Sequence, residues 1–264
     1  MLYTPKLGGW LPDHNQPGIH EDYKFDELAN KLILNESITD GTIDLRRFCP
    51  PVENQGHLGS CVGNAVVGGL ELLQIKEGIQ FRDLSRLFVY YNSRLMSGDQ
   101  DKDGGTYIRI AMGTLSSIGT CTEQKWPYDV SKVFIRPTWG SYRDAYANKV
   151  SGYYRIDGSG QSRVDAVKHA LQAQHPVTFG MLVDQNYMNV SHDGLIAMPS
   201  ANRGDAGGHA QLIVGCIDSQ RRYIVRNSWG EDWGDHSYCY VPYDYLDASE
   251  AHDLWVPTLT ITGL

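Results

Sequence analysis

One stretch of the chain restricts the fold more than any other. Between Ser60 and Lys76, apolar and small residues cover most of the circumference of a helix. A helix that is apolar on nearly all sides has to be surrounded by other parts of the protein. The chain has 264 residues, which is long enough to build a core around such a helix. The sequence therefore predicts a buried central helix over residues 60–76.

Helical and extended patterns occupy different parts of the chain. Helical periodicity continues over residues 84–95 and 108–118, and one further helix is predicted over residues 162–173. The β-type runs, bounded by Gly, Asp or Pro, cover residues 153–156, 177–183, 210–217, 222–226 and 237–241. This order predicts an α+β fold with a helical lobe at about 43–149, an antiparallel, barrel-like β lobe at about 150–264, and a groove between them.

Residues 1–42 differ from the rest of the chain. Pro and Gly break the first twenty residues into turns, and apolar residues then recur at helical spacing, at Phe25, Leu28, Ala29, Leu32 and Ile33. The pattern predicts a loop and a short amphipathic helix that needs a surface to cover. Two hypotheses follow: the segment lies over or beside the groove and regulates access as a propeptide does, or it is a strap around the fold.

The charge balance and the hydropathy argue against two classes of partner. Acidic residues outnumber basic ones by 31 to 23, and basic residues form no run longer than a pair, so we expect no nucleic-acid partner. No stretch reaches the roughly 18 apolar residues of a membrane span, and residues 1–10 lack the pattern of a secretion signal. We expect a monomer that is cytoplasmic, exported without such a signal, or one whose signal has been removed.

The cysteines are odd in number, at positions 49, 61, 121, 216 and 239, so at least one thiol has no partner within the chain. None forms a Cys-x-x-Cys motif, and no His pair has zinc-ligand spacing. The run Asp99, Asp101, Asp103 and Gly104 resembles the start of a calcium-binding loop, but its twelfth position is Ile110 instead of Glu. We therefore expect neither a metal nor a cofactor.

Cys61 stands at the predicted N-terminus of the buried helix, after the glycine-containing run 55–60. Backbone N–H groups at a helix N-terminus favour a thiolate and can lower the pKa of a thiol by several units from about 8.5. Taken alone, the run could equally be a turn with an inert, buried cysteine. Two further motifs bear on the choice, at residues 207–210 and 226–234.

Together the three motifs resemble those of the papain family of cysteine peptidases. They are Gln-Gly-x-x-Gly-Ser-Cys at 55–61, a His at 209 that opens a strand, and Asn-Ser-Trp-Gly-x-x-Trp-Gly at 227–234. The resemblance covers most of the chain after residue 43, and the pattern of residues is similar to that of the bacterial branch of the family. It implies a papain-like fold over residues 43–264 and a thiol protease, made as a zymogen, that hydrolyses peptides or proteins.

The resemblance also implies catalytic roles. The Cys61 thiolate would attack the peptide carbonyl and form an acyl-enzyme, while the His209 imidazolium would protonate the leaving amine. Asn227 would accept the other ring N–H of His209, and Trp229 would cover that hydrogen bond. The side chain of Gln55 and the backbone N–H of Cys61 would stabilise the oxyanion.

Further residues are implied in substrate binding. Gly104, Gly105 and Gly208 would let an extended peptide form hydrogen bonds with the enzyme backbone. The pocket for the second residue of the substrate would be formed by Thr106, Tyr107, Phe179, Gly207 and Ala210. Val62 stands where many relatives have Trp, which leaves the leaving-group side without a large wall residue. Two alternatives to hydrolysis stay open: acyl transfer such as transamidation with the same Cys–His pair, and a non-catalytic peptide-binding module.

Overall fold

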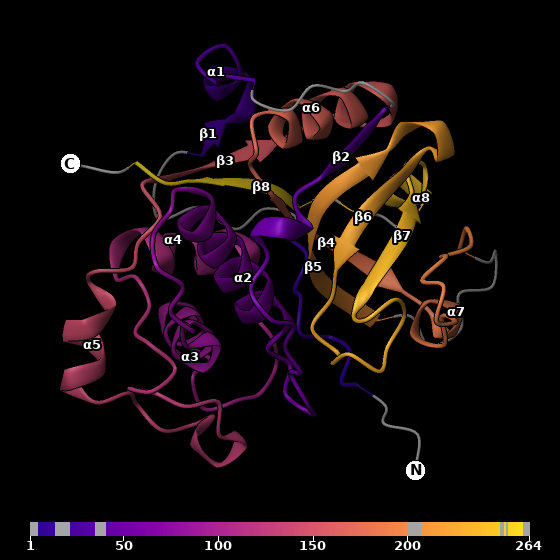
Figure 1. The fold of residues 1–264 in the computed structure, drawn as a ribbon. Coiled ribbons are helices and arrows are strands. Elements are labelled where there is room, and N and C mark those ends of the chain that lie inside the picture. Colours follow the sequence, from indigo (N-terminus) through magenta and orange to yellow (C-terminus); the bar gives the residue numbers. More distant parts are fainter. Residues whose placement is uncertain are drawn as a thin grey trace.

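The computed structural model describes residues 5–13, 22–34, 41–199, 207–248, 251 and 253–260. Helices and strands segregate to two sides of the molecule (Figure 1). The helical side holds α2 (Cys61–Lys76), α3 (Arg86–Ser97), α4 (Ile108–Ser117) and α5 (Trp139–Ala145). The other side holds most of a sheet together with α6 (Gly160–Gln172), α7 (Gln185–Met188) and α8 (Tyr245–Ala248). The predicted α+β arrangement of two lobes is confirmed.

The central helix α2 is buried as its sequence predicts, since every residue from 61 to 74 is buried. It packs against α3 and α4 on one side and against strand β5 on the other. Gly63 lets α3 approach closely, because a Cβ at this position would lie 2.9 Å from the backbone oxygen of Arg86. The helix therefore holds the helical lobe and the sheet together. These contacts on both sides fix the position of its N-terminus.

The sheet has eight strands in the order β1-β3-β8-β4-β5-β6-β7, with β2 paired to β5. Their bounds are β1 Tyr23–Lys24, β2 Thr42–Asp44, β3 Gly152–Ile156, β4 Val177–Val183, β5 Gly207–Ile217, β6 Arg222–Arg226, β7 Tyr238–Pro242 and β8 Asp253–Thr258. All pairs are antiparallel except β1 with β3. The prediction of a barrel-like lobe was wrong: in the described chain the sheet is open, because β1 and β7 lie at its opposite ends and do not pair with each other.

The N-terminal region contributes to both lobes. β1 adds to the sheet edge, and α1 (Phe25–Ala29) packs against β3 and α6. The helix is shorter than the apolar spacing predicts: Phe25 and Leu28 are buried in it, while Ala29 and Leu32 pack against the core only partly buried. Ile33 is 76% exposed and lies beyond the end of the helix. The strand β8 was not predicted, although it forms the middle of the sheet between β3 and β4.

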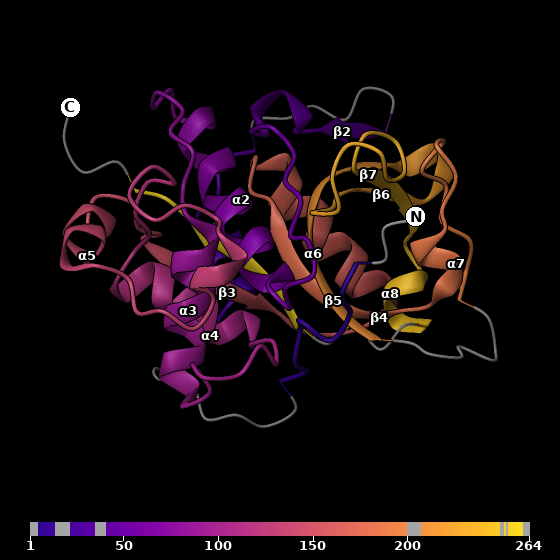
Figure 2. The ribbon, with the colours of Figure 1, turned by 90° about the horizontal axis from the view of Figure 1, so that it is seen from below.

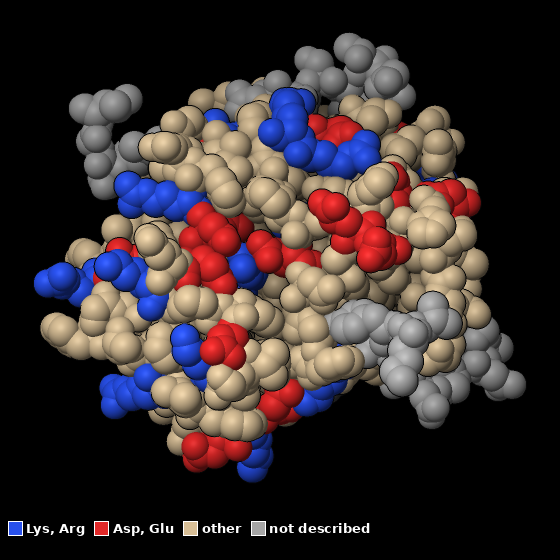
Figure 3. Space-filling model, turned by 60° about the horizontal axis from the view of Figure 1, so that its bottom comes forward, with Lys and Arg blue, Asp and Glu red and all other residues tan. Residues whose placement is uncertain are grey.

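The surface carries charges of both signs. On the face shown in Figure 3, Lys and Arg side chains lie scattered among Asp and Glu. Exposed ion pairs of the described chain include that of Lys102 with Asp99 and that of Arg221 with Asp244. Among the described residues, no helix combines the length and the apolar character that crossing a membrane requires.

Candidate active site

Cys61 is the first residue of α2 and is fully buried. The loop before it is held in place at Gln55, which is also fully buried. The Gln55 side-chain amide donates a hydrogen bond to the backbone oxygen of Leu58 (3.0 Å), and its oxygen accepts one from the Ser228 hydroxyl (2.8 Å). The loop that leads into the helix is thereby tied to the segment that follows β6. All five cysteines lie in the described part of the chain and are free thiols there.

His209 lies on β5 opposite Met181 of β4. Its Nε2 lies 2.8 Å from Oδ1 of Asn227, which also accepts the backbone N–H of Ser228 at 2.8 Å. Because this amide oxygen can only accept, Nε2 of His209 is the nitrogen that donates. The ring of Trp229 stacks on the imidazole, with the ring centroids 4.4 Å apart and an angle of 24° between the planes. Within the described chain, Nδ1 of His209 has no hydrogen-bond partner.

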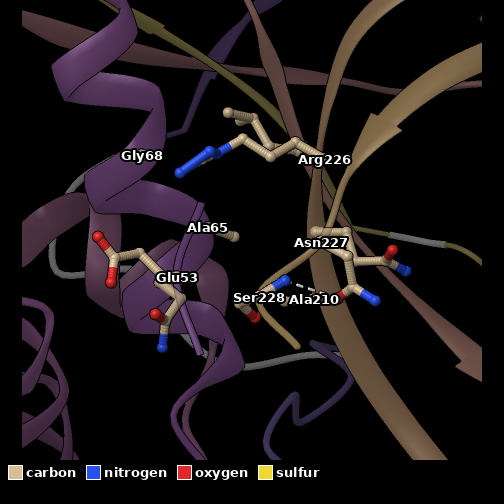
Figure 4. A pocket seen from close by; sticks show the side chains of 10 residues that line it. Glu53, Ala65, Gly68, Ala210, Arg226, Asn227 and Ser228 are labelled. Atoms are coloured by element: carbon tan, nitrogen blue, oxygen red, sulfur yellow. Dashed lines mark hydrogen bonds between the residues drawn. The ribbon is translucent and has the colours of Figure 1, made fainter. Parts of the chain in front are cut away.

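A small cavity lies behind this group, between α2 and strands β5 and β6 (Figure 4). In the close-up, Ala65 and Gly68 of α2 face Arg226 and Asn227 across it. The Arg226 guanidinium extends toward α2 and donates to the backbone oxygens of Pro50 (3.3 Å) and Pro51 (2.6 Å). Asn227 therefore follows a residue that is fixed to the helical lobe, which restricts how the Asn227 amide can move.

The described N-terminal residues 5–13 pass between the two lobes. Both ribbon views show the indigo N-terminal trace between the helices and β5 (Figures 1 and 2). On the sheet side, Gly8 N donates to the Gly208 oxygen (2.8 Å). On the helical side, Thr106 N donates to the Gly9 oxygen (3.1 Å), and Leu11 N donates to the Thr106 oxygen (3.0 Å). Trp10 and Thr106 thus form a parallel bridge.

This segment lies directly against the thiol. A Cβ built on Gly9 would come within 2.7 Å of the Cys61 sulfur and of the Gly59 oxygen. On the helical side, a Cβ on Gly105 would come within 2.6 Å of the Gly8 oxygen, and on the sheet side one on Gly208 would come within 2.4 Å of the Trp10 oxygen. Heavy-atom contacts to a Cβ this short are essentially never seen, so glycine is required on both sides of the contact.

Side chains anchor the segment at both of its ends. The ammonium of Lys6 donates to the backbone oxygen of Asp103 (2.7 Å) and pairs with its carboxylate. Asp13 pairs with the guanidinium of Arg109 (2.7 Å). Between them, the Trp10 side chain is 1% exposed and donates its indole N–H to the Asp253 carboxylate (3.0 Å). The segment therefore combines backbone pairing, two ion pairs and one buried aromatic side chain.

Burial sets the protonation of Cys61 and His209 in this covered state. It raises the pKa of the Cys61 thiol to about 12, although backbone N–H groups of residues 61, 62 and 210 lower it in part. Burial also lowers the pKa of His209 to about 4, against the opposing effect of its hydrogen bond to Asn227. With residues 5–13 in place, a neutral thiol and a neutral imidazole are therefore the favoured forms at neutral pH.

The structure brings most of the sequence-predicted site residues together. His209, Asn227 and Trp229 contact one another, and Gln55 joins them through Ser228. Cys61 packs in the same core cluster as Ala210, the residue after His209. The positions that line residues 5–13 are Gly105, Thr106, Gly207 and Gly208, with Ala210 in the core cluster of Trp10. A Cβ built on Gly104 would have no heavy atom within 4 Å, so this position is open. Tyr107 lies directly before the first residue of α4.

Phe179 lies elsewhere, in the core of the β lobe. The neighbouring Gly180 faces the Trp10 ring instead, because successive residues of a strand point to opposite faces. The sequence reasoning also missed Trp10 and Asp253. A large aromatic residue in a segment rich in Pro and Gly was the available signal for Trp10.

Comparison with known proteins identifies the class. Residues 40–251 match the model of the papain family cysteine proteases, so the chain belongs to that family. It is similar to the crystal structure of xylellain, a cysteine protease from Xylella fastidiosa, with a TM-score of 0.79, 29% identity and 97% of each chain covered. The structure of procathepsin L2 from Tenebrio molitor shares the fold at 21% identity, with a TM-score of 0.74, over 96% of this chain and 78% of that one.

Curated sequences agree with this assignment. An uncharacterized peptidase C1-like protein of Acanthamoeba polyphaga mimivirus is 34% identical over 236 residues, which are 84% of this chain and 76% of the viral protein. A cathepsin L-like peptidase of Aedes aegypti is 27% identical over 83% of this chain and 62% of its own length. The chain thus spans less than two thirds of the mosquito protein but more of the viral one. These relatives identify the chain as a cysteine peptidase by homology.

Proposed function

We propose that the chain hydrolyses peptide bonds with Cys61 as the nucleophile, His209 as the acid and base, and Asn227 as the residue that orients His209. The observation that carries this proposal is the fixed imidazole: its Nε2 donates to Asn227, and Trp229 covers one ring face. Nδ1 is then the nitrogen left to exchange a proton with a thiol. Gln55, held beside Cys61 by two hydrogen bonds, would donate its second amide N–H to the oxyanion.

The chemistry proceeds through two steps. The Cys61 sulfur forms a bond to the substrate carbonyl carbon, and His209 gives a proton to the amine as the C–N bond breaks. His209 then takes a proton from water, whose oxygen attacks the thioester carbon. The C–S bond breaks, the acid is released, and Cys61 is left as a thiolate beside the His209 imidazolium. Each step needs His209 to hold one orientation while its charge changes, and the bond to Asn227 and the stacked Trp229 favour that orientation.

We further propose that residues 5–13 inhibit the enzyme within its own chain. In support of this, Cys61 and His209 are both fully buried, the segment lies against the Cys61 sulfur, and it pairs with both walls of the site. It also removes the water that an ion pair of thiolate and imidazolium needs, as the direction of both pKa shifts indicates. Opening of the segment would restore solvent to the pair and let it form.

Labelling of Cys61 tests both proposals in the full-length chain. A chloromethyl ketone peptide is added to wild type, to Gly9→Ala and to a Cys61→Ala control, and the labelled residue is identified by mass spectrometry. The Cβ of Gly9→Ala would overlap the Cys61 sulfur and displace the segment, so we expect faster labelling at Cys61 and a gain of peptide hydrolysis. Gly140→Ala on α5, where a Cβ has no neighbour closer than 3.7 Å, is the matched control.

Each proposal has its own contrary result. If the open variant is folded but labels no faster than wild type, residues 5–13 do not control access. If Cys61 is labelled yet peptides are not cleaved, or if cleavage persists in Cys61→Ala, the assigned hydrolytic role is wrong. Capture of the acyl group by added amines in preference to water would indicate acyl transfer instead.

A further inference from the structure

Two buried side-chain amides, those of Gln211 and Asn227, lie next to each other beside His209. Gln211 and His209 are on the same face of β5, because alternate residues of a strand point the same way. Leu212 of β5 is opposite Arg226 of β6, so the same register extended by one residue brings Gln211 opposite Asn227. Residues directly opposite in an antiparallel pair have Cβ atoms about 4.5–5.5 Å apart. Both residues are buried, and both border the small cavity between α2, β5 and β6.

These two amides leave two buried N–H groups unmatched. The Asn227 oxygen already accepts from His209 and Ser228. The Gln211 oxygen accepts from the Tyr187 hydroxyl (2.7 Å). Within the described chain, neither Nδ2 of Asn227 nor Nε2 of Gln211 has an acceptor, which is costly for a buried donor. A half turn of the Gln211 amide exchanges its oxygen and its nitrogen with almost no change in shape. The turned amide provides an acceptor to Asn227 and a donor to Tyr187.

Tyr187 can bond the Gln211 amide in either orientation, because a phenol hydroxyl both donates and accepts. Its oxygen also lies 3.1 Å from the sulfur of Cys239, so its proton has a second acceptor when Gln211 is the donor. The ring is held in place: it stacks on Trp233, with centroids 5.7 Å apart and 25° between the planes, and it meets Trp229 edge-on at 6.4 Å and 88°. Both nitrogens that lacked an acceptor then have one.

We propose that Gln211 is a positioning residue: its side-chain oxygen accepts a hydrogen bond from Nδ2 of Asn227 and so keeps Oδ1 of Asn227 directed at His209. The inference rests on the proposed function, because Gln211 acts only through Asn227 and His209. The backbone N–H of Ser228 holds the oxygen end of the Asn227 amide, and Gln211 holds its nitrogen end.

The orientation of the Asn227 amide decides which nitrogen of His209 carries the proton. A turned Asn227 would present its own N–H to Nε2 of His209. Nε2 would then have to accept, and the neutral ring would carry its proton on Nδ1. Nδ1 could no longer take the proton of the Cys61 thiol. Gln211 therefore supports the one arrangement in which His209 can act as the base.

The hydrogen bond between Asn227 and Gln211 is tested first in the full-length wild-type chain. The chain is labelled with 15N-asparagine, and the side-chain signals of Asn227 are assigned by their absence from the NMR spectrum of Asn227→Ala. We expect one Nδ2 proton of Asn227 to resonate downfield of an unbonded side-chain amide. It should move upfield in Gln211→Met, which keeps the shape of glutamine but offers only a weakly accepting sulfur. Gln74→Met is the matched control: it removes another buried glutamine, which bonds Asn148 (3.3 Å), and should leave these protons unchanged.

Kinetics then test whether this hydrogen bond positions Asn227 for the reaction. In the Gly9→Ala background, which we expect to be open, Gln211→Met should lower kcat for a fluorogenic peptide about tenfold. KM should stay unchanged, because a residue that acts through Asn227 does not bind the substrate. Gln211→Glu should retain most of kcat, since its carboxyl group offers Asn227 an oxygen in either protonation state. When Asn227→Ala is already present, Gln211→Met should lower kcat no further.

Failure of the inference is distinct from failure of the proposed function. Wild-type Asn227 protons that resonate like those of an unbonded amide, or that do not respond to Gln211→Met, overturn the inference whatever the kinetics. An equal loss of kcat with and without Asn227 also overturns it, because Gln211 then acts by another route. If circular dichroism and the melting temperature show that Gln211→Met does not fold, the wild-type signals decide alone. If the Asn227 protons behave as expected but no variant cleaves peptides, the hydrogen bond stands and the proposed function fails.

Discussion

Replacing Trp10 by alanine should convert the covered chain into an active one. The side chain is 1% exposed, and it donates to Asp253, so nearly all of its surface leaves water when the segment closes. Truncation of a buried aromatic residue to alanine typically costs about 3–5 kcal/mol. Here that cost falls on the closed state relative to the open state, because the ring contacts the rest of the protein only when residues 5–13 are in place.

We take about 3 kcal/mol as the effect, since an open segment would still cover part of the ring. At about 1.4 kcal/mol for each factor of ten, the ratio of open to closed molecules rises about a hundredfold. If opening limits access to Cys61, the second-order rate of thiol labelling at pH 7 should increase by about that factor, until the open form predominates.

The assay measures alkylation of Cys61 by mass spectrometry and hydrolysis of a fluorogenic peptide in parallel. Trp139→Ala is the matched control, because Trp139 is 80% exposed on α5. A Trp10→Ala chain that keeps its melting temperature and yet labels no faster than the Trp139→Ala control would refute the reasoning. It would mean that residues 5–13 do not depend on this side chain for their position.

Three further predictions follow from the charges. Burial holds the pKa of His209 at about 4 in the closed state, against about 6.5 when the ring is solvated. Protons therefore bind preferentially to the open state. The free energy that favours closure should decrease by up to about 3 kcal/mol as the pH falls from 6.5 to 4. Hydrogen exchange of the amides of residues 8–11, corrected for intrinsic rates, should report this loss in wild type but not in His209→Gln. Lys6→Ala should raise the rate of Cys61 labelling about two- to fivefold, and by less in high salt, because it removes the ion pair with Asp103. Lys102→Ala, which removes the pair with Asp99, should leave the rate unchanged. A larger effect of the Lys102 change would contradict the role of Lys6 in anchoring residues 5–13. Burial raises the pKa of Glu71 to about 8, so the folded state holds that proton more tightly than the unfolded state. The melting temperature of the wild type should therefore fall as the pH rises from 5 to 8. Glu71→Gln should flatten this dependence, and an equally steep fall in the variant would exclude Glu71 as its origin.

The residues of the proposed catalytic group could be selected from the sequence because each belongs to a local motif. The glycine run before Cys61 and the strand that begins near His209 are short-range features, and the pattern of residues 227–234 places Asn227 and Trp229 together. The central helix was equally predictable, since apolar and small residues cover most of its circumference. The local conformation at these residues follows from their neighbours in the sequence, so predicting it requires no information about distant contacts.

The arrangement of the residues around Trp10 could not be predicted in this way, because it depends on contacts between segments far apart in the sequence. Trp10 and Asp253 are 243 residues apart, and β8, which carries Asp253, was not predicted although it lies inside the sheet. Phe179 was assigned to the pocket and Gly180 was not, because a one-residue difference in strand register moves a side chain to the opposite face.

The sequence by itself therefore determined the α+β class and the buried helix, and it supplied the residues that we propose as reactive. Only the tertiary structure decided that residues 5–13 lie against Cys61, that the sheet stays open, and that Asp253 meets Trp10. The physical reason is that periodicity and turn chemistry act over a few residues, whereas these outcomes depend on which surfaces remain to be covered once the two lobes have packed.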